Sequence, residues 1–493
     1  MTVVVAIDAG TTGVRAIAFG TDGLPVHRAH REFPQHFPRP GWVEHDVDEI
    51  ATAVDAVCAD LATALDAAGR RIAAIGITDQ RETIVAWDRT TGRPLHRAIV
   101  WQDRRTSDLC ERLERDGALD IVRSTTGLVL DPYFSGTKAR WLLDHADVPR
   151  DGSAVLGTID SWLIWRLTGG AVHVTDVSNA SRTMLLDLHT GEWSAEMSEV
   201  LGVPASMLPR VVTSSGRVGT TTGDCPLGAG IPISGIAGDQ QASLFGQACF
   251  APGDAKSTYG TGAFVLMNVG VDCPPPVDGL LTTIAWQLDG TGPLTYAYEG
   301  SVFATGAAVQ WLRDGLGVIE RSDDVTALAQ SVDTTDGVMI VPAFTGLGSP
   351  WWDPHARGTV LGITRGTTAA HLARATLESI ALQTRDVIDA MTAGAHRPLS
   401  SLRADGGGAT DLVLQLQADQ LGVPVLRPVV EETTALGAAY LAGLAEGVWD
   451  SLDDVTRNWA CGHTAEPSHD RSAAEATHAR WLRAVERSRD WDR

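Results

Sequence analysis

The chain has 493 residues, of which 44% are hydrophobic and 20% are charged. This length and composition indicate a globular protein of two or three domains, large enough to enclose a ligand site. The formal net charge of −22 argues against a nucleic-acid partner, because the phosphate backbone attracts basic surfaces. It does not exclude a small anionic ligand that is held by backbone amides, a metal ion and a few local cations.

The cysteines and the N-terminus bear on the location of the protein. Six cysteines are scattered without any C-x-x-C pair, so we expect no disulfide framework and no zinc site. The N-terminus enters a strand without a basic leader or a cleavage site, and no apolar stretch reaches the length of a membrane-spanning helix. We therefore expect a cytoplasmic protein without an integral membrane segment.

The first predicted elements are two strands joined by a Gly/Thr turn. The apolar run "TVVVAID" ends at Asp8, and "AGTTG" leads into a second strand that continues to Phe19. A helix is expected from Asp46 to about Gly69, because apolar residues recur there at three- and four-residue steps. "RIAAIGIT" and "IVAWDRTTGRP" then read as strands around the polar insert "DQRET". This alternation of strands and helices predicts an α/β protein.

The second half repeats this pattern. "AKSTYGTGAFVLMNVG" reads as a strand, a Gly/Thr turn and a strand, a long helix is expected near 368–391, and "RADGGGATDLVLQLQADQLG" reads as strand, glycine turn and helix. The two Gly/Thr hairpins predict two related domains with a cleft between them. We place the domains at 1–247 and 248–493, because "FGQACFAPGD" supplies a Pro-Gly break there.

The Gly/Thr turns are candidates for phosphate binding. The P-loop motif is absent, and "DAGTTGVRAIAF" leads from a strand into a second strand rather than into a helix, so it is not a Rossmann motif either. Its backbone N–H groups and the hydroxyls of Thr11 and Thr12 could still hold phosphate. Asp8 could hold Mg²⁺ through water, and Arg15 supplies a local cation. Taken alone, such a hairpin more often satisfies only its own turn.

Two further glycine turns change that balance. "YGTGAF" covers Tyr259–Phe264, and "DGGGATD" covers Asp405–Asp411. Three such loops in one α/β chain predict a nucleotide that is clamped between two lobes.

Candidate substrate residues surround the same strands. Arg81 and Glu82 in "QRET" are an adjacent donor and acceptor that follow a buried strand, although such a pair is more often a surface ion pair. Trp101 and Phe264 could form an apolar wall and Tyr133 could add a hydroxyl, whereas core packing is the alternative for each aromatic ring.

One carboxylate stands in an otherwise apolar and small stretch, "IPISGIAGDQQASLFG". Burying Asp239 there is costly unless another group pairs with it. The structural alternative for Asp239 is the N-cap of a helix.

These motifs, in this order, resemble the FGGY carbohydrate kinases of the actin–hexokinase–Hsp70 superfamily. "YFSGTKARWLLDH" and "GTVLGITRGTTAAHLARATLE" are similar to signatures of that family, and the similarity runs to about residue 450. Within the family, the chain most resembles the members that phosphorylate glycerol. The resemblance implies an α/β fold in which two ribonuclease-H-like (actin-like ATPase) domains flank a central cleft.

The resemblance also implies roles for particular residues. Asp239 would be the general base of phosphoryl transfer from ATP. The polyol would be held by Arg81, Glu82, Trp101, Tyr133, Asp239, Gln240 and Phe264. The nucleotide and its phosphates would contact Thr11, Thr12, Gly13, Arg15, Thr261, Gly306, Gln310 and Gly407. Asp8 would position Mg²⁺, the substrates would be glycerol and ATP, and the expected assembly is a homodimer or homotetramer.

Two alternatives stay open from the sequence. The first is an FGGY kinase of another polyol or of a ketose, such as erythritol or xylulose. The second is an actin-like or chaperone-like ATPase that switches conformation or polymerises. The second would share the nucleotide loops but would not need "QRET", "WQDRR" and "GDQQ" together.

Overall fold

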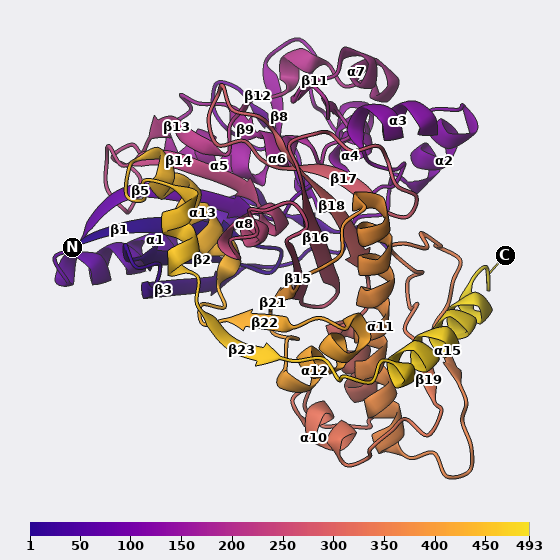
Figure 1. Cartoon of the computed structure of the whole chain (residues 1–493). Coiled ribbons are helices and arrows are strands. Elements are labelled where there is room, and N and C mark those ends of the chain that lie inside the picture. The colour runs from indigo at the N-terminus through magenta and orange to yellow at the C-terminus, as the bar shows by residue number, and fades with distance from the viewer. Residues whose placement is uncertain (493) are drawn as a thin grey trace.

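The computed structural model describes residues 1–492, and its largest N-terminal element is a six-stranded sheet (Figure 1). The strand order is β13-β14-β5-β1-β2-β3. The strands are β1 (Thr2–Ala9), β2 (Gly13–Phe19), β3 (Pro25–Glu32), β5 (Arg71–Asp79), β13 (Ser215–Thr220) and β14 (Pro232–Gly238). β1, β2 and β3 form an antiparallel meander, and β5 and β14 extend the sheet in parallel with β1.

The C-terminal sheet repeats this plan in seven strands, with the order β17-β18-β16-β15-β21-β22-β23. The strands are β15 (Ala255–Tyr259), β16 (Ala263–Gly270), β17 (Leu281–Trp286), β18 (Thr295–Val302), β21 (Leu402–Asp405), β22 (Val425–Pro428) and β23 (Cys461–Ala465). Here β15, β16 and β18 pair antiparallel, and β21 and β22 continue in parallel with β15. The prediction of one α/β strand pattern in both halves is therefore confirmed.

The predicted helices are present, with small differences at their ends. α1 (Val47–Ala67) begins after Asp46, whose side chain accepts the N–H of Asp48 as an N-cap. α11 (Ala369–Ala395) continues beyond the predicted 391. The prediction stopped there because residues 392–395 are small and do not continue the apolar pattern. The strand predicted for 84–94 was too long: β6 (Ile84–Asp88) ends where the Asp88 carboxylate accepts the N–H of Thr90 and closes a turn.

A smaller four-stranded sheet, in the order β4-β7-β6-β8, lies beside the N-terminal sheet and carries part of the site described below. The remaining strands are β4 (Glu44–His45), β7 (Ala98–Ile99), β8 (Ala154–Thr158), β9 (Val174–Asp176), β10 (Leu186–Asp187), β11 (Glu192–Trp193), β12 (Arg210–Val212), β19 (Met339–Val341) and β20 (Thr359–Leu361). The remaining helices are α2 (Ser107–Arg115), α3 (Leu119–Thr126), α4 (Ser135–His145), α5 (Ile159–Leu167), α6 (Val177–Ala180), α7 (Ala195–Leu201), α8 (Asp239–Gly246), α9 (Gly306–Gln310), α10 (Asp324–Gln330), α12 (Asp411–Leu421), α13 (Thr433–Ala445), α14 (Leu452–Asn458) and α15 (Ser472–Ser488).

Helices α8 and α13 join the two halves of the chain. In sequence, α13 lies between β22 and β23 of the C-terminal sheet, but it packs on the N-terminal sheet and on α8, as its gold ribbon beside β1 and β5 shows (Figure 1). A Cβ atom at Gly246 would overlap the carbonyl oxygen of Thr433, and one at Gly437 would overlap that of Ala242. The two backbones therefore touch where the helices cross, which only glycine permits.

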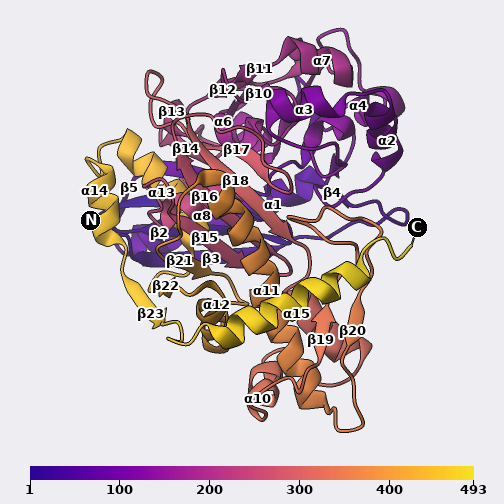
Figure 2. The ribbon, with the colours of Figure 1, turned by 45° about the vertical axis from the view of Figure 1, so that its right-hand side comes forward.

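α15 closes the C-terminal part of the fold. It lies across α12 and the two-stranded sheet of β19 and β20 (Figure 2). Its Trp481 is fully buried and donates a 2.7 Å hydrogen bond to the carboxylate of Asp386 on α11. Within residues 1–492, no helix is both long enough and apolar enough to cross a membrane.

The predicted division into domains 1–247 and 248–493 stays a prediction. Arg493, the last residue of the second predicted domain, lies outside the described residues.

Candidate active site

Three parallel strands bring the candidate residues to one edge of the N-terminal sheet. In the register of β1 with β5, Ala9 pairs with Asp79, and in that of β14 with β5, Gly238 pairs with Asp79. The carboxyl ends of these strands therefore lie side by side. The first Gly/Thr loop, Arg81 and Asp239 directly follow these ends, which is where ligands bind in open α/β sheets.

Arg81 is the centre of the cluster and is 2% exposed. Its Nε lies 3.2 Å from Oδ1 of Asp239. Its two Nη atoms donate to the two carboxylate oxygens of Glu299 at 2.5 and 3.0 Å. They also donate to the hydroxyl of Tyr133 at 3.2 Å and to the side-chain oxygen of Gln241 at 3.3 Å. Such a two-pronged carboxylate contact fixes the plane of the guanidinium group.

A second arginine completes this buried network. Arg182 donates from Nε to Glu82 at 2.7 Å and from Nη2 to Glu299 at 3.0 Å. The side chains of Arg81, Arg182, Glu82 and Glu299 are at most 2% exposed, and their two positive and two negative charges balance. Burial alone would raise the pKa of Glu299, but Arg182 and Arg81 lower it overall. Glu299 is therefore ionised, whereas burial raises the pKa of Glu82 against the opposing charges of Arg81 and Arg182. Glu299 on β18 connects the C-terminal sheet to Arg81.

Three aromatic rings line one side of the cluster. The ring of Trp101 lies 5.6 Å from that of Tyr133 and 6.2 Å from that of Phe264, both edge to face. The guanidinium carbon of Arg81 lies 5.7 Å from the Phe264 ring centre. The apolar side chains predicted to face substrate carbons thus lie directly against the predicted hydroxyl-binding groups.

Asp239 is the first residue of α8, and its side chain is 29% exposed. It is not the N-cap, because Gly238 holds that position, although Oδ1 accepts the N–H of Gln240 at 2.7 Å. Burial raises the pKa of Asp239, and the charges of Arg81 and Lys256 oppose that rise. Asp239 is thus an accessible carboxylate next to a fixed cation, which suits a base that takes up a proton.

The first Gly/Thr loop is tight and its tip is open to solvent. The N–H of Gly10 donates to the carbonyl of Gly13 at 3.0 Å, and Thr12 is exposed. Behind the loop, the side-chain amides of Gln80 and Gln35 donate to the carbonyls of Gly10 and Thr11 at 3.1 and 2.9 Å. These contacts hold the loop from below and leave its tip free for a ligand.

The second Gly/Thr loop, which contains Thr261, contacts the start of α9, which carries the predicted nucleotide residues Gly306 and Gln310. The N–H groups of Thr305 and Gly306 donate to the carbonyls of Thr261 and Gly260, both at 3.0 Å. α9, which begins at Gly306 and ends at the exposed Gln310, is therefore fastened to the loop.

The third loop joins the second through Tyr259. The N–H of Gly408 donates to the Tyr259 carbonyl at 2.9 Å, and Gly406 has a φ of +89° with no room for a Cβ atom against that carbonyl. Gly407 is left exposed at the tip. The structure thus brings Thr261, Gly306 and Gly407 together.

Asp8 and Arg15 lie where the first loop faces α13. Arg15 is 48% exposed, and its Nη1 lies 2.7 Å from Glu432 and 4.0 Å from Asp8. Burial, with smaller contributions from Asp239 and Glu432, raises the pKa of Asp8 to about 7, although Arg15 opposes this rise. Asp8 is thus a buried carboxylate whose charged form is disfavoured mainly by burial, and a divalent cation bound to it would stabilise that form.

The donor set also fits Mg²⁺ in particular. Among residues 1–492, no group of three or more His, Cys, Asp and Glu side chains could hold a metal ion by itself. Mg²⁺ commonly takes only one or two carboxylates and completes its coordination with water and substrate phosphates. Asp8 beside a phosphate loop matches that pattern.

Profiles of one protein family match most of the chain. The N-terminal domain of the FGGY family of carbohydrate kinases matches residues 3–246, and the C-terminal domain of that family matches residues 255–446. The chain belongs to the FGGY family of carbohydrate kinases.

Individual relatives of this FGGY kinase span its whole length. A glycerol kinase from Bordetella parapertussis is 55% identical over 99% of this chain and 98% of its own length. The crystal structure of Plasmodium falciparum glycerol kinase with ADP is 35% identical, has a TM-score of 0.93 and covers 99% of this chain and 98% of its own. A xylulose kinase from Rhodospirillum rubrum is 26% identical, with a TM-score of 0.83 and 98% of both chains covered. These matches confirm the α/β fold with two FGGY domains.

Several residues of this FGGY kinase that hold the cluster together were missed in the sequence. Arg182 and Glu299 had no predicted role, although Glu299 is the single charge in the strand "TYAYEGSV". Gln241 had no predicted role, yet it contacts Arg81. Lys256 is one of only two lysines in the chain, which was the one available signal for it.

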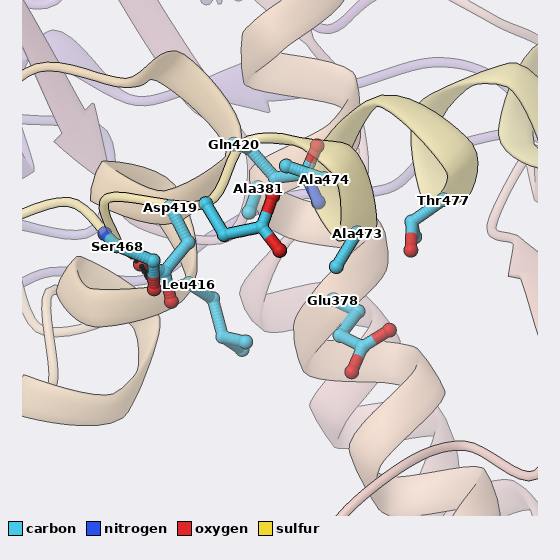
Figure 3. Close-up of a pocket in the computed structure, with 10 residues that line it drawn as sticks. Glu378, Ala381, Leu416, Asp419, Gln420, Ser468, Ala473, Ala474 and Thr477 are labelled. Carbon is cyan, nitrogen blue, oxygen red and sulfur yellow. Dashed lines mark hydrogen bonds between the residues drawn. The ribbon is translucent and has the colours of Figure 1, made fainter.

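A separate cavity of this FGGY kinase, of about 160 Å³, lies between α11, α12 and α15 (Figure 3). Its polar lining includes Glu378, Asp419 and Thr477. The carboxylate of Asp419 already accepts hydrogen bonds from the N–H and the hydroxyl of Ser468, both at 2.8 Å. None of the predicted site residues lines this cavity, so it is not part of the cluster around Arg81.

Proposed function

We propose that this chain transfers the γ-phosphoryl group of ATP to glycerol and forms sn-glycerol 3-phosphate. One observation carries the proposal: the partly exposed carboxylate of Asp239 lies against the fixed guanidinium of Arg81, and that guanidinium lies over the Phe264 ring of the aromatic wall. A small polyol needs that combination of polar groups and apolar surface. The 55% identity to a glycerol kinase over nearly the full length supports glycerol as the polyol.

In the proposed reaction, Asp239 accepts the proton of the glycerol hydroxyl that attacks the γ-phosphorus. The Arg81 guanidinium beside it favours the ionised form and holds the carboxylate in place. Glu82, Tyr133 and Gln240 supply the remaining polar partners of the hydroxyls. Trp101 and Phe264 cover the carbon atoms and exclude water that would otherwise compete as the nucleophile.

The phosphates are proposed to lie between the three glycine loops. Thr11, Thr12, Gly13, Thr261 and Gly407 would offer backbone N–H groups and hydroxyls at exposed loop tips. Arg15 would exchange its contact with Glu432 for a phosphate oxygen. The adenosine part would contact Gly306 and Gln310.

Asp8 is proposed to hold Mg²⁺, which when bound neutralises phosphate charge. The residues of the chain then need only to position the two substrates and to take up one proton, as phosphoryl transfer requires.

The test is formation of glycerol 3-phosphate by the purified protein with MgATP and glycerol. Erythritol, xylulose and a reaction without polyol belong in the same assay. A kcat/KM for xylulose or erythritol equal to that for glycerol would favour a different FGGY kinase. ATP hydrolysis at a rate that does not depend on polyol, together with filament formation, would favour the actin-like ATPase.

A homodimer or homotetramer and a cytoplasmic location are further parts of the proposal. Native mass spectrometry would test the oligomeric state, and cell fractionation would test the location.

A further inference from the structure

Lys256 is a fully buried cation next to the proposed polyol site. It lies on β15, and its Nζ donates to Oε1 of Gln240 at 2.5 Å and to the hydroxyl of Thr258 at 2.9 Å. Within residues 1–492 it forms no ion pair with a carboxylate, so neutral oxygens alone receive its hydrogen bonds.

Such an arrangement is expensive for a purely structural side chain. A buried ammonium group without a carboxylate partner loses hydration that amide and hydroxyl oxygens replace only in part. Burial lowers the pKa of Lys256 to about 8, although the charges of Asp405, Asp239 and Glu299 oppose that fall. A methionine would fill a similar volume at lower cost, so the charge itself has a use.

The contact determines which way the amide of Gln240 points. An ammonium group can only donate hydrogen bonds, so the atom that it contacts must be the carbonyl oxygen, Oε1. The Nε2 group is therefore turned away from Lys256. No acceptor for Nε2 is found among residues 1–492, and Gln240 as a whole is 7% exposed.

We propose that Lys256 is a positioning residue that orients the amide of Gln240 so that its N–H₂ group, and not its carbonyl, faces the bound polyol. The inference rests on the proposed function, because it concerns the same substrate site. The start of α8 then offers two opposite groups to the polyol: the carboxylate of Asp239 accepts a hydrogen bond, and the amide N–H₂ of Gln240 donates one. Since a hydroxyl can both donate and accept, this pair selects hydroxyls over groups that do only one of these.

The first experiment removes the charge. Lys256→Met should raise the KM for glycerol about tenfold or more, the cost of an amide that is no longer held and a buried acceptor without a partner. The KM for ATP should change less than the KM for glycerol, because the hydrogen bonds of Lys256 go to Gln240 and Thr258 and not to a residue of the glycine loops. A smaller folded fraction would instead lower the apparent kcat without a selective rise in the KM for glycerol.

A double-mutant cycle tests whether Lys256 acts through Gln240. If it does, Lys256→Met should add little to the loss of kcat/KM for glycerol that Gln240→Leu causes alone. Fully additive losses would overturn the proposal. Ser257→Ala is the matched control. Ser257 is buried and directly follows Lys256 on β15, so its side chain points to the face of the sheet opposite Lys256.

A second variant keeps the test valid if Lys256→Met fails to fold. Gln240→Glu retains an oxygen opposite Lys256 and replaces the outward N–H₂ donor by an acceptor. We expect an unchanged or higher Tm and a KM for glycerol raised about tenfold or more. A KM within about twofold of wild type would mean that the carbonyl faces the substrate, and would overturn the proposal.

The two levels of inference fail in different ways. A wild-type protein that does not phosphorylate glycerol overturns the proposed function and this inference with it. A wild-type protein that does so, together with a Lys256→Met variant of normal KM for glycerol, overturns the inference alone.

Discussion

The indole N–H of Trp101 donates a 2.9 Å hydrogen bond to the hydroxyl of Thr11. Trp101 belongs to the aromatic wall of the proposed polyol site, and Thr11 belongs to the first phosphate loop. This bond is thus a direct link between the two proposed substrate sites. It also uses one donor and one acceptor that would otherwise be open to solvent or to ligand.

Replacing Trp101 by phenylalanine should break this link while keeping an aromatic surface. The loss of one hydrogen bond, about 1 kcal/mol, predicts a fall in kcat/KM of roughly fivefold. Steady-state kinetics with each substrate varied in turn would measure it. Thr11→Val should cause a larger loss, because it also removes a proposed phosphate donor, and the double variant should be little worse than Thr11→Val alone. Independent, additive effects would show that the bond does not couple the two sites.

Asp239→Asn should leave the fold intact and lower kcat by about 10²- to 10⁴-fold. The amide has the shape of the carboxylate, and its oxygen can still contact Arg81, but it cannot take up a proton at neutral pH. Thermal unfolding and kcat should be measured on the same preparation. A folded Asn variant with near-normal turnover would remove Asp239 from its proposed role.

Glu299→Gln should destabilise the protein by about 3–5 kcal/mol, because it leaves Arg81 and Arg182 buried without their shared counter-charge. Denaturant unfolding at neutral pH would measure the change. Asp60→Asn is the control: it breaks an exposed pair with Arg31 and should cost at most about 1 kcal/mol. Equal losses for the two variants would contradict the balanced network described above.

His45 should make the protein sensitive to acid. It is fully buried between Gln35 and Gln80, with ring contacts of 2.6 and 3.2 Å, and burial, helped by the nearby charge of His36, lowers its pKa from 6.5 to about 3. Below pH 6.5 the unfolded chain therefore binds a proton that the folded chain does not. Folding stability must fall as the pH drops from about 6.5 toward 3.

His45→Gln removes this titration and keeps a donor and an acceptor. At pH 7 we expect the variant to be somewhat less stable than wild type, and this difference should shrink as the pH falls to 4. Melting temperatures of both proteins across this range would measure the effect. A difference that stays constant with pH would show that His45 does not titrate as its burial requires.

The sequence by itself determined the first strand of each half, the helix after Asp46 and the glycine turns, although it missed the end of β6. The apolar run before Asp8, the three-four spacing after Asp46 and the glycine turns at 260 and 406 each predicted what the backbone does there, because these signals are local. The full set of predicted polyol residues came from the resemblance to the FGGY family, and the structure brings Arg81, Tyr133 and Asp239 together as expected. Their roles in catalysis remain predictions.

Only the tertiary structure decided how those residues are held. Glu299 lies 218 positions from Arg81 and Lys256 lies on a different sheet from the strand before Gln240, so no spacing rule connects them. The reason is physical: a buried charge must find its partner wherever the packed fold places one, and that partner is set by three-dimensional proximity rather than by sequence order. Local propensity forms the strands and loops. The packing of the two sheets against each other determines which buried charges are paired and leaves the carboxylate of Asp239 partly exposed.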